Sequence, residues 1–282
     1  MKPCIEEIEF HGQRALRLRG PRGSEATVSP FGAQVLSWRT PDGRERLYLS
    51  EKAVFDGNSP VRGGIPVCFP QFGTLGPLPR HGLVRTRNWS VAEQRSGEDY
   101  ALLTLACGDD AASRERWPHA FGLELTVMLE ADRLDLELCV SNPGASAFAF
   151  TAALHTYLRV VQVEDVAVEG LYGHHYRDAL AGHAEQRDSG TEFCLEGPAE
   201  RVYRQIRRPQ LLRAGNLSLG LQQQGFPDTV IWNPWDAGCA ATPDLPADGW
   251  RHFICIEAAA ADTAQTVAAG VEWYGRQTLL AV

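Results

Sequence analysis

The strongest constraint on the fold is a strict alternation of apolar and other side chains between residues 123 and 140. Leu or Val occupies every second position from Leu123 to Leu129, and Glu, Thr and Met stand between them. After a short polar break at 131–133, the alternation resumes from Leu134 to Val140. Successive side chains of a strand point to opposite faces, so each segment predicts a half-buried strand. The short break predicts that the two strands form an antiparallel hairpin.

Other segments with strand-like patterns occur along the whole chain, whereas helical patterns are short and few. These segments are 15–18, 26–28, 34–38, 101–105, 147–160, 216–223, 229–232 and 252–257. A parallel sheet would need longer helices between its strands. We therefore expect an all-β chain that forms a large antiparallel β-sandwich. Because no repeat, low-complexity tract or linker divides the sequence, we expect residues 1–282 to form a single domain.

Charge and composition limit the partners and the location. The net charge of −8 argues against nucleic acid as the main partner, although a local arginine cluster can still hold a small anion. The first ten residues carry three glutamates, and no apolar run reaches 18 residues, so we expect no membrane segment and a cytoplasmic protein. The seven cysteines are widely spaced without a CxxC pair, and we expect them to be reduced and mostly buried. The oligomeric state stays open, with a monomer as the expectation.

Glycine and proline are concentrated at 57–82 and 233–250, and we expect loops there and in the mixed stretch 170–198. The first loop contains RGGIPVCFPQFG at 62–73 and LPRHGLVR at 78–85. Their polar side chains include Arg62, Arg80, His81 and Arg85. Glycine lets a backbone approach a ligand closely, and guanidinium groups grip anionic oxygens with paired hydrogen bonds. These residues can converge on a phosphate or a polyhydroxyl ring, and a pair of surface loops with solvated charges explains them equally well.

His155 lies in an apolar segment that reads as a strand. At a period of two, Phe148, Phe150, Ala152 and Leu154 form a bulky face, and His155 lies on the other face, among small and polar side chains. Such a face leaves room for a ligand, and an imidazole exchanges protons near neutral pH. A purely structural histidine is the competing interpretation, because most strand histidines have no catalytic role.

Glu257 ends the strand-like segment 252–257 and shares a face with Phe253 and Cys255. A carboxyl group on an apolar face is a functional candidate, because burial raises its pKa and makes it a better proton acceptor. The alternatives are a solvated strand end or an ion pair with an arginine.

A histidine cluster at His174, His175 and His183 is the only group that suggests a metal site. Adjacent histidines on a strand point to opposite faces, and no acidic or cysteine residue stands at a recurrent ligand spacing. We therefore expect no metal.

Several of these segments together resemble the hexose-6-phosphate mutarotases of the aldose 1-epimerase superfamily. They are RGGIPVCFPQFG, the turn PRHGLVR at 79–85 and the strand that ends in Glu257, together with SPFGAQVLSW at 29–38 and residues 168–178. The resemblance implies a β-sandwich with a cleft on one concave face. It also implies roles for single residues: His155 as general acid, Glu257 as general base, His81 in the cleft, and Arg62 and Arg85 on the sugar phosphate.

Two positions depart from the family pattern. Arg80 stands where the family often has Gln before the HG turn, and Glu200 stands where it has Asp in a T-D-R-V-Y-like segment. Both positions line the family's sugar site, so we count Arg80 and Glu200 among the substrate-binding residues and leave the exact sugar open.

The implied reaction is the interconversion of the α and β anomers of a hexose 6-phosphate, an isomerisation that needs one acid, one base and no cofactor. The implied partner is a small sugar phosphate. The sequence leaves three alternatives: a free-aldose 1-epimerase, a non-catalytic sugar-binding protein, and a glycoside hydrolase, which would use two carboxylates.

Overall fold

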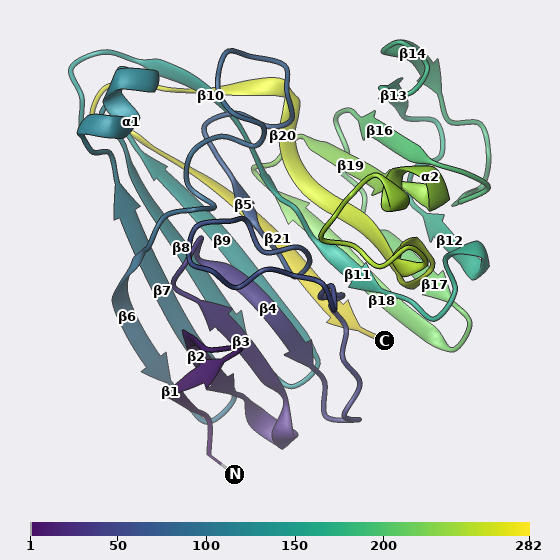
Figure 1. The fold of residues 1–282 in the computed structure, drawn as a ribbon, viewed down its shortest axis with the longest axis horizontal. Coiled ribbons are helices and arrows are strands. Elements are labelled where there is room, and N and C mark those ends of the chain that lie inside the picture. The colour runs from purple at the N-terminus through teal and green to yellow at the C-terminus, as the bar shows by residue number, and fades with distance from the viewer. Residues whose placement is uncertain (1) are drawn as a thin grey trace.

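The structure is a computed structural model that describes residues 2–282, and its named strands pair only in the antiparallel sense (Figure 1). One sheet has four strands in chain order: β1 (Cys4–Phe10), β2 (Gln13–Arg19), β3 (Glu25–Ser29) and β4 (Gln34–Arg39). The nine-stranded sheet has the order β15 (Glu192–Cys194), β12 (Val166–Glu169), β17 (Gln210–Ala214), β18 (Leu217–Gln224), β21 (Glu272–Ala281), β9 (Arg133–Ser141), β8 (Gly122–Leu129), β7 (Ala101–Gly108) and β6 (Ser90–Ser96).

The eight-stranded sheet carries most of the residues that the sequence marks as functional. Its order is β14 (Ala184–Arg187), β13 (His175–Asp178), β16 (Ala199–Tyr203), β19 (Asp228–Asn233), β20 (Phe253–Val267), β10 (Phe148–Leu154) and β5 (Val67–Cys68), and β11 (Tyr157–Arg159) also pairs with β20. The helices are α1 (Ala111–Arg116), α2 (Trp235–Ala240) and the 3₁₀ turns Pro21–Gly23, Val163–Asp165 and Gly249–His252. No helix among residues 2–282 is long and apolar enough to cross a lipid bilayer.

The two large sheets pack face to face and enclose the main core, which confirms the predicted β-sandwich (Figure 1). Phe150 on β10 meets Trp273 on β21 with their ring centroids 5.2 Å apart. Gln277 on β21 donates a hydrogen bond of 3.0 Å to the carbonyl oxygen of Ile256 on β20. The nine-stranded sheet therefore supports the inner face of β20, and the opposite face of β20 is available for a site.

The hairpin predicted from the alternating pattern is β8 and β9, with Leu129 opposite Leu134. Its apolar positions, from Leu123 to Val140, are buried. Every other segment predicted as a strand overlaps an observed one. The loop predicted over 170–198 is wrong in part, because β13, β14 and β15 lie within it, and the loop predicted over 233–250 contains α2. All seven cysteine thiols are free, but only three are buried, so the expectation that most are buried is wrong.

The single strand predicted over 147–160 is interrupted at His155. The amide of His155 donates to the carbonyl oxygen of Pro66, and the amide of Thr156 turns back to that of Leu154, each at 2.9 Å. The first bond extends the pairing of β10 with β5 by one residue, and the second turns the chain between β10 and β11, which both pair with β20. The interruption places His155 at the point where two strand segments meet.

The long strand β20 is held in place by one buried carboxylate. Asp228 is 0% exposed and accepts hydrogen bonds of 2.9–3.0 Å from the amides of Ala261, Asp262 and Thr263. These amides lie next to the register shift between β10 and β20. Asp228 therefore satisfies backbone donors that a regular ladder would leave free.

We expect Asp228→Ala to lower the free energy of unfolding by about 3 kcal/mol, because it leaves several buried amides without an acceptor. Urea denaturation measures the change. Asp132→Ala is the matched control: Asp132 pairs with Arg22 on the surface, 2.8 Å apart, and its loss should cost less than about 1 kcal/mol. Equal losses in the two variants would contradict this role for Asp228.

Candidate active site

Two adjoining cavities lie on the face of the eight-stranded sheet that points away from the main core. The first, about 180 Å³ and here called the carboxylate cavity, is lined by Phe72, Gly73, Thr74, Arg80, His81, His155, Glu200, Val230, Trp232 and Glu257. The second, about 60 Å³ and here called the arginine cavity, is lined by Pro60, Val61, Arg62, Pro66, Arg80, His81, Arg85, His155, Tyr157 and Trp232. The two cavities share four residues, so they form the two ends of one cleft.

Larger cavities of about 300 and 470 Å³ lie around Phe10 and Phe55. Their titratable side chains are all at least partly exposed. Buried acid and base groups are the better sign of chemistry, so volume does not decide which cavity is the site.

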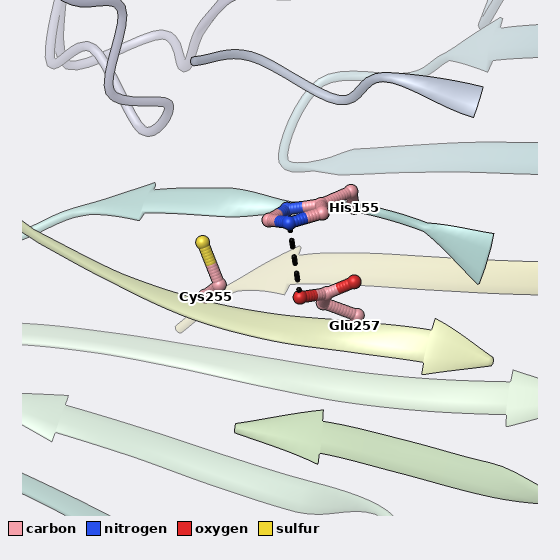
Figure 2. Close-up of side chains that lie close together, drawn as sticks. All are labelled: His155, Cys255 and Glu257. Atoms are coloured by element: carbon pink, nitrogen blue, oxygen red, sulfur yellow. Dashed lines mark ion pairs between the residues drawn. The ribbon is translucent and has the colours of Figure 1, made fainter. Parts of the chain in front are cut away.

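His155 and Glu257 point toward one another (Figure 2), and both line the carboxylate cavity. The distance from His155 Nε2 to Glu257 Oε1 is 3.4 Å, and the two residues are 7% and 1% exposed. Their other polar atoms, His155 Nδ1 and Glu257 Oε2, are buried without a hydrogen-bond partner among residues 2–282. Buried polar groups are normally satisfied, so these atoms mark a place where a ligand can bind.

The surroundings of this pair favour its uncharged form. Burial raises the pKa of Glu257 well above its ordinary range, the charge of Glu200 raises it further, and Arg80 opposes this. Burial lowers the pKa of His155 well below its ordinary range, and His81, Arg62 and Arg85 lower it further. The favoured state therefore has one proton, held on the carboxyl group. The charged state, carboxylate and imidazolium, differs from it only by movement of that proton within the pair.

Three aromatic rings fix the orientation of the His155 imidazole. Tyr157 stacks on it with ring centroids 4.8 Å apart and an angle of 15° between the planes. His81 and Trp232 meet it edge-on, at 5.3 and 5.7 Å. The imidazole is therefore enclosed by side chains that cannot move independently of it.

His81 occupies a tight turn at the edge of both cavities. The next residue, Gly82, has a φ of +81°, and a Cβ there would lie 2.1 Å from the carbonyl oxygen of Phe69, so the turn requires glycine. His81 Nδ1 lies 3.4 Å from the amide of Gly73, and Nε2 lies 3.2 Å from Arg80 Nε. Burial and the neighbouring arginines lower the pKa of His81 to about 3. A neutral imidazole has one acceptor nitrogen, so it accepts from only one of these donors at a time.

Three guanidinium groups line the cleft, and Arg62 is the one of them that forms an ion pair with a carboxylate among residues 2–282. Arg62 Nε lies 3.2 Å from both oxygens of Asp244. Arg85 donates to the backbone carbonyl of Arg80, and among residues 2–282 neither Arg80 nor Arg85 has a carboxylate partner. An excess of positive charge in a partly buried cleft predicts an anionic ligand.

Each predicted site residue lies at this cleft, and two alternative interpretations from the sequence are wrong. Glu257 lies within β20, buried against His155, and is neither at a solvated strand end nor paired with an arginine. Arg62 and His81 line a cavity, which the reading as solvated surface loops does not predict. Glu200 lines the carboxylate cavity from β16, and Arg80 lines both cavities while remaining exposed.

Comparison with known proteins identifies the family. The family described as aldose 1-epimerase matches residues 14–280. The chain belongs to the aldose 1-epimerase family. It is therefore an isomerase, and its substrate is a small sugar.

Individual relatives support this assignment. The chain is 34% identical to a protein of Cenchrus ciliaris named "Putative glucose-6-phosphate 1-epimerase", over 96% of this chain and 85% of that one. A crystal structure of a "putative mutarotase" from Salmonella typhimurium is similar with a TM-score of 0.90 and 26% identity, over 99% of this chain and 93% of that one. Galactose 1-epimerase from Lactobacillus acidophilus NCFM has the same fold, with a TM-score of 0.77 and 14% identity over 100% and 99%.

Sequence reasoning missed three contributors to this epimerase's cleft. Tyr157 is two positions from His155, so the two-residue period of a strand places both side chains on the same face, and this spacing could have predicted Tyr157. Trp232 and Asp244 come from segments about 80 residues further along the chain, and no local pattern marks them.

The donor atoms of His155, Cys255 and Glu257 lie within 4.8 Å of one another, a group that the sequence did not suggest (Figure 2). Tetrahedral zinc with bonds of about 2.0–2.3 Å needs its ligand atoms roughly 3.3–3.8 Å apart. The neighbouring arginines also oppose a cation. The expectation of no metal therefore stays a prediction.

We expect Glu257→Gln to stabilise the fold increasingly as pH rises. The raised pKa of Glu257 means that the unfolded chain loses this proton above the ordinary value of 4.5 while the folded chain keeps it. The parent therefore loses stability as pH rises from 4.5 toward the folded pKa, whereas glutamine does not titrate. The gain should reach about 1–3 kcal/mol at pH 8.

Thermal denaturation at pH 5, 6.5 and 8 measures this effect, with Glu115→Gln on the exposed face of α1 as the control. A stability difference between Glu257→Gln and the parent that stays constant with pH would show that burial does not shift this carboxyl group.

Proposed function

We propose that this protein interconverts the α and β anomers of a hexose 6-phosphate, with Glu257 as general base and His155 as general acid. The observation that carries the proposal is the order of groups along the cleft. The arginine cavity comes first, His155 lines both cavities, and Glu257 lines only the carboxylate cavity.

The same order occurs in the substrate. In a hexopyranose 6-phosphate, the phosphate is linked through C6 to C5, the ring oxygen O5 joins C5 to C1, and C1 carries the hydroxyl O1. A phosphate held by Arg62 and Arg85 puts O5 next to His155 and O1 next to Glu257. The order of groups along the cleft thus matches the order in the substrate: the anionic phosphate, then O5, which accepts a proton, and then the O1 hydroxyl, which donates one.

The reaction needs two proton transfers. The Glu257 carboxylate accepts the proton of the O1 hydroxyl, and the electrons of that O–H bond form the C1=O double bond. The C1–O5 bond breaks, and its electron pair on O5 takes the proton from the His155 imidazolium. Rotation about C1–C2 turns the other face of the aldehyde toward O5, and the steps reverse. No electrons leave the sugar, so the proposal requires no cofactor and no metal.

The charge state of the pair suits this cycle. After ring opening the pair holds one proton on Glu257 and a neutral His155, which is the state that burial favours. The open-chain stage therefore leaves no buried charge on the pair, and the enzyme neither takes up nor releases a proton over the cycle.

The remaining polar residues are proposed to bind the sugar. Arg80, His81 and Glu200 surround the carboxylate cavity, where the hydroxyl groups at C2 to C4 would lie. They come from a loop and from β16, whereas the acid and base come from the neighbourhood of β10 and β20. The proposal therefore treats residues 1–282 as one domain, since every part of the cleft depends on distant segments.

Glu200 is also the residue that a glycoside hydrolase would use beside Glu257. It lies on β16, separated from β20 only by β19, so the strand axes are about 9–10 Å apart. Membership of the aldose 1-epimerase family favours anomer exchange over hydrolysis.

The preference for a phosphorylated sugar is tested by comparing kcat/KM for glucose 6-phosphate and glucose, measured by magnetisation-exchange NMR. We expect Arg62→Ala and Arg85→Ala each to lose tenfold to a hundredfold with glucose 6-phosphate only, because each removes a charge-assisted contact of about 1.5–3 kcal/mol. Arg213→Ala, which removes an exposed ion pair, should change neither. No preference in the parent, or equal losses on both sugars, would favour a free-aldose 1-epimerase.

The proposed acid and base are tested with glucose 6-phosphate in the same assay. We expect Glu257→Gln to abolish catalysis, because the amide cannot accept the O1 proton, and His155→Ala to lose about 100-fold. The parent should keep its activity after dialysis against a chelator. If sugar phosphate binds while exchange stays at the uncatalysed rate, the protein is a sugar-binding protein without catalysis.

A further inference from the structure

The phosphate-binding end of the cleft is connected to His155 by a continuous set of contacts. Both oxygens of Asp244 accept from Arg62 Nε at 3.2 Å, and Arg62 Nη1 donates to the Tyr157 hydroxyl at 3.1 Å. The Tyr157 ring then lies flat against His155, 4.8 Å away. These side chains come from three separate segments of the chain, since only His155 and Tyr157 are close in sequence, so the connection depends on the fold and on no local motif.

Asp244 and Tyr157 orient the Arg62 guanidinium, but they do not use all of its hydrogen-bond donors. A guanidinium has five N–H donors, and the contacts with Asp244 and Tyr157 use one on Nε and one on Nη1. The other three have no protein acceptor among residues 2–282, and Arg62 lines the arginine cavity. An anion in that cavity would therefore bind to Arg62 while Asp244 and Tyr157 hold the guanidinium plane.

Tyr157 is placed so that it responds to Arg62 and affects His155. It is 2% exposed, and its ring also meets Phe253 and Trp232, at 5.2 and 6.0 Å. Burial raises the pKa of its hydroxyl, so the phenol stays neutral. In a close-packed interior, a shift of the guanidinium that carries the hydroxyl with it also moves the ring that supports His155.

The charges around His155 also couple an anion in the arginine cavity to the acid–base pair. The imidazole of His155 contacts the rings of His81 and Tyr157 and the carboxyl group of Glu257. Arg62, Arg80 and Arg85 line the same cleft. Arg62 and Arg85 disfavour a proton on His155. A dianion between these two arginines offsets their charge, and the single proton of the His155–Glu257 pair then moves more readily to the imidazole. The result is the charged pair that ring opening requires.

We propose that the phosphate group of the substrate switches on the acid–base pair through Arg62 and Tyr157, so that a separate dianion activates turnover of a sugar that carries no phosphate. Tyr157 and Asp244 are then positioning residues, which act through His155 and Arg62. This inference rests on the proposed hexose 6-phosphate function, because it assumes a phosphate in the arginine cavity.

The experiment measures anomer exchange of D-xylose, which lacks C6 and its phosphate, with increasing phosphite or sulfate. Phosphite resembles the phosphoryl group, and sulfate is a dianion too weakly basic to catalyse exchange itself. We expect both to raise kcat/KM for xylose at least tenfold in a saturable way. Activation should disappear in Arg62→Ala, and the rate without protein serves as the baseline for each anion.

Tyr157→Phe separates the positioning role from a merely structural one, because it keeps the ring and removes the hydroxyl. With glucose 6-phosphate we expect kcat to fall about tenfold while KM changes less than threefold, and the activation of xylose turnover to be lost. Asp244→Asn should mainly raise KM for glucose 6-phosphate, with partial recovery in Asp244→Glu. Tyr274→Phe, at a half-exposed tyrosine on β21, is the matched control and should behave as the parent.

A nuclear magnetic resonance measurement on the parent protein tests the proton shift without any substitution. The ¹⁵N shifts of the His155 imidazole in the parent should move toward the imidazolium values when sulfate is added.

The outcomes separate the two proposals. If glucose 6-phosphate is preferred over glucose but no dianion activates xylose turnover, the inference is wrong and the proposed function stands. If activation persists in Tyr157→Phe, the role assigned to Tyr157 is wrong. If the parent does not prefer glucose 6-phosphate, the proposed function itself fails.

Discussion

The site depends on the burial of one imidazole and one carboxyl group in direct contact. Water would stabilise the charged forms of His155 and Glu257, and the protein interior does not, so each group is driven toward its neutral form. When one group of such a pair accepts a proton from a ligand and the other donates a proton to it, the net charge of the pair does not change. The same burial leaves His155 Nδ1 and Glu257 Oε2 without hydrogen-bond partners among residues 2–282, and a ligand in the carboxylate cavity can satisfy them.

The β-sandwich supplies what this pair requires. Glu257 lies within a long strand that has neighbours on both sides, so its backbone is fixed, while His155 lies in the gap between β10 and β11. The nine-stranded sheet supports β20 from behind through Gln277, and Asp228 fixes the irregular stretch that follows. A rigid strand and an interrupted strand thus hold the carboxyl and the imidazole 3.4 Å apart.

The parts of this arrangement that depend on local pattern could be predicted from the sequence. The two-residue period of a strand predicts the alternation of β8 and β9, and it also predicts on which strand face His155 and Glu257 lie. The interruption at His155 could not be predicted, because no local pattern in the apolar run 147–160 marks the turn between Leu154 and Thr156. Among the short strands within 170–198, β14 is exposed throughout and lacks an alternating apolar pattern, and Asp244 contacts Arg62 across 182 residues. Such features are properties of tertiary packing.

The charge along the cleft differs from the net charge of −8, because Arg62, Arg80 and Arg85 all line the cleft. Arg80 and Glu200 act on the pKa of Glu257 in opposite directions: Glu200 raises it and Arg80 lowers it. A neutral side chain at position 80 would leave the effect of Glu200 on this pKa unopposed. Arg80 therefore makes the Glu257 carboxylate more available while adding positive charge at the junction of the two cavities. One side chain thus favours both the charged form of Glu257 and a positive potential in the cleft.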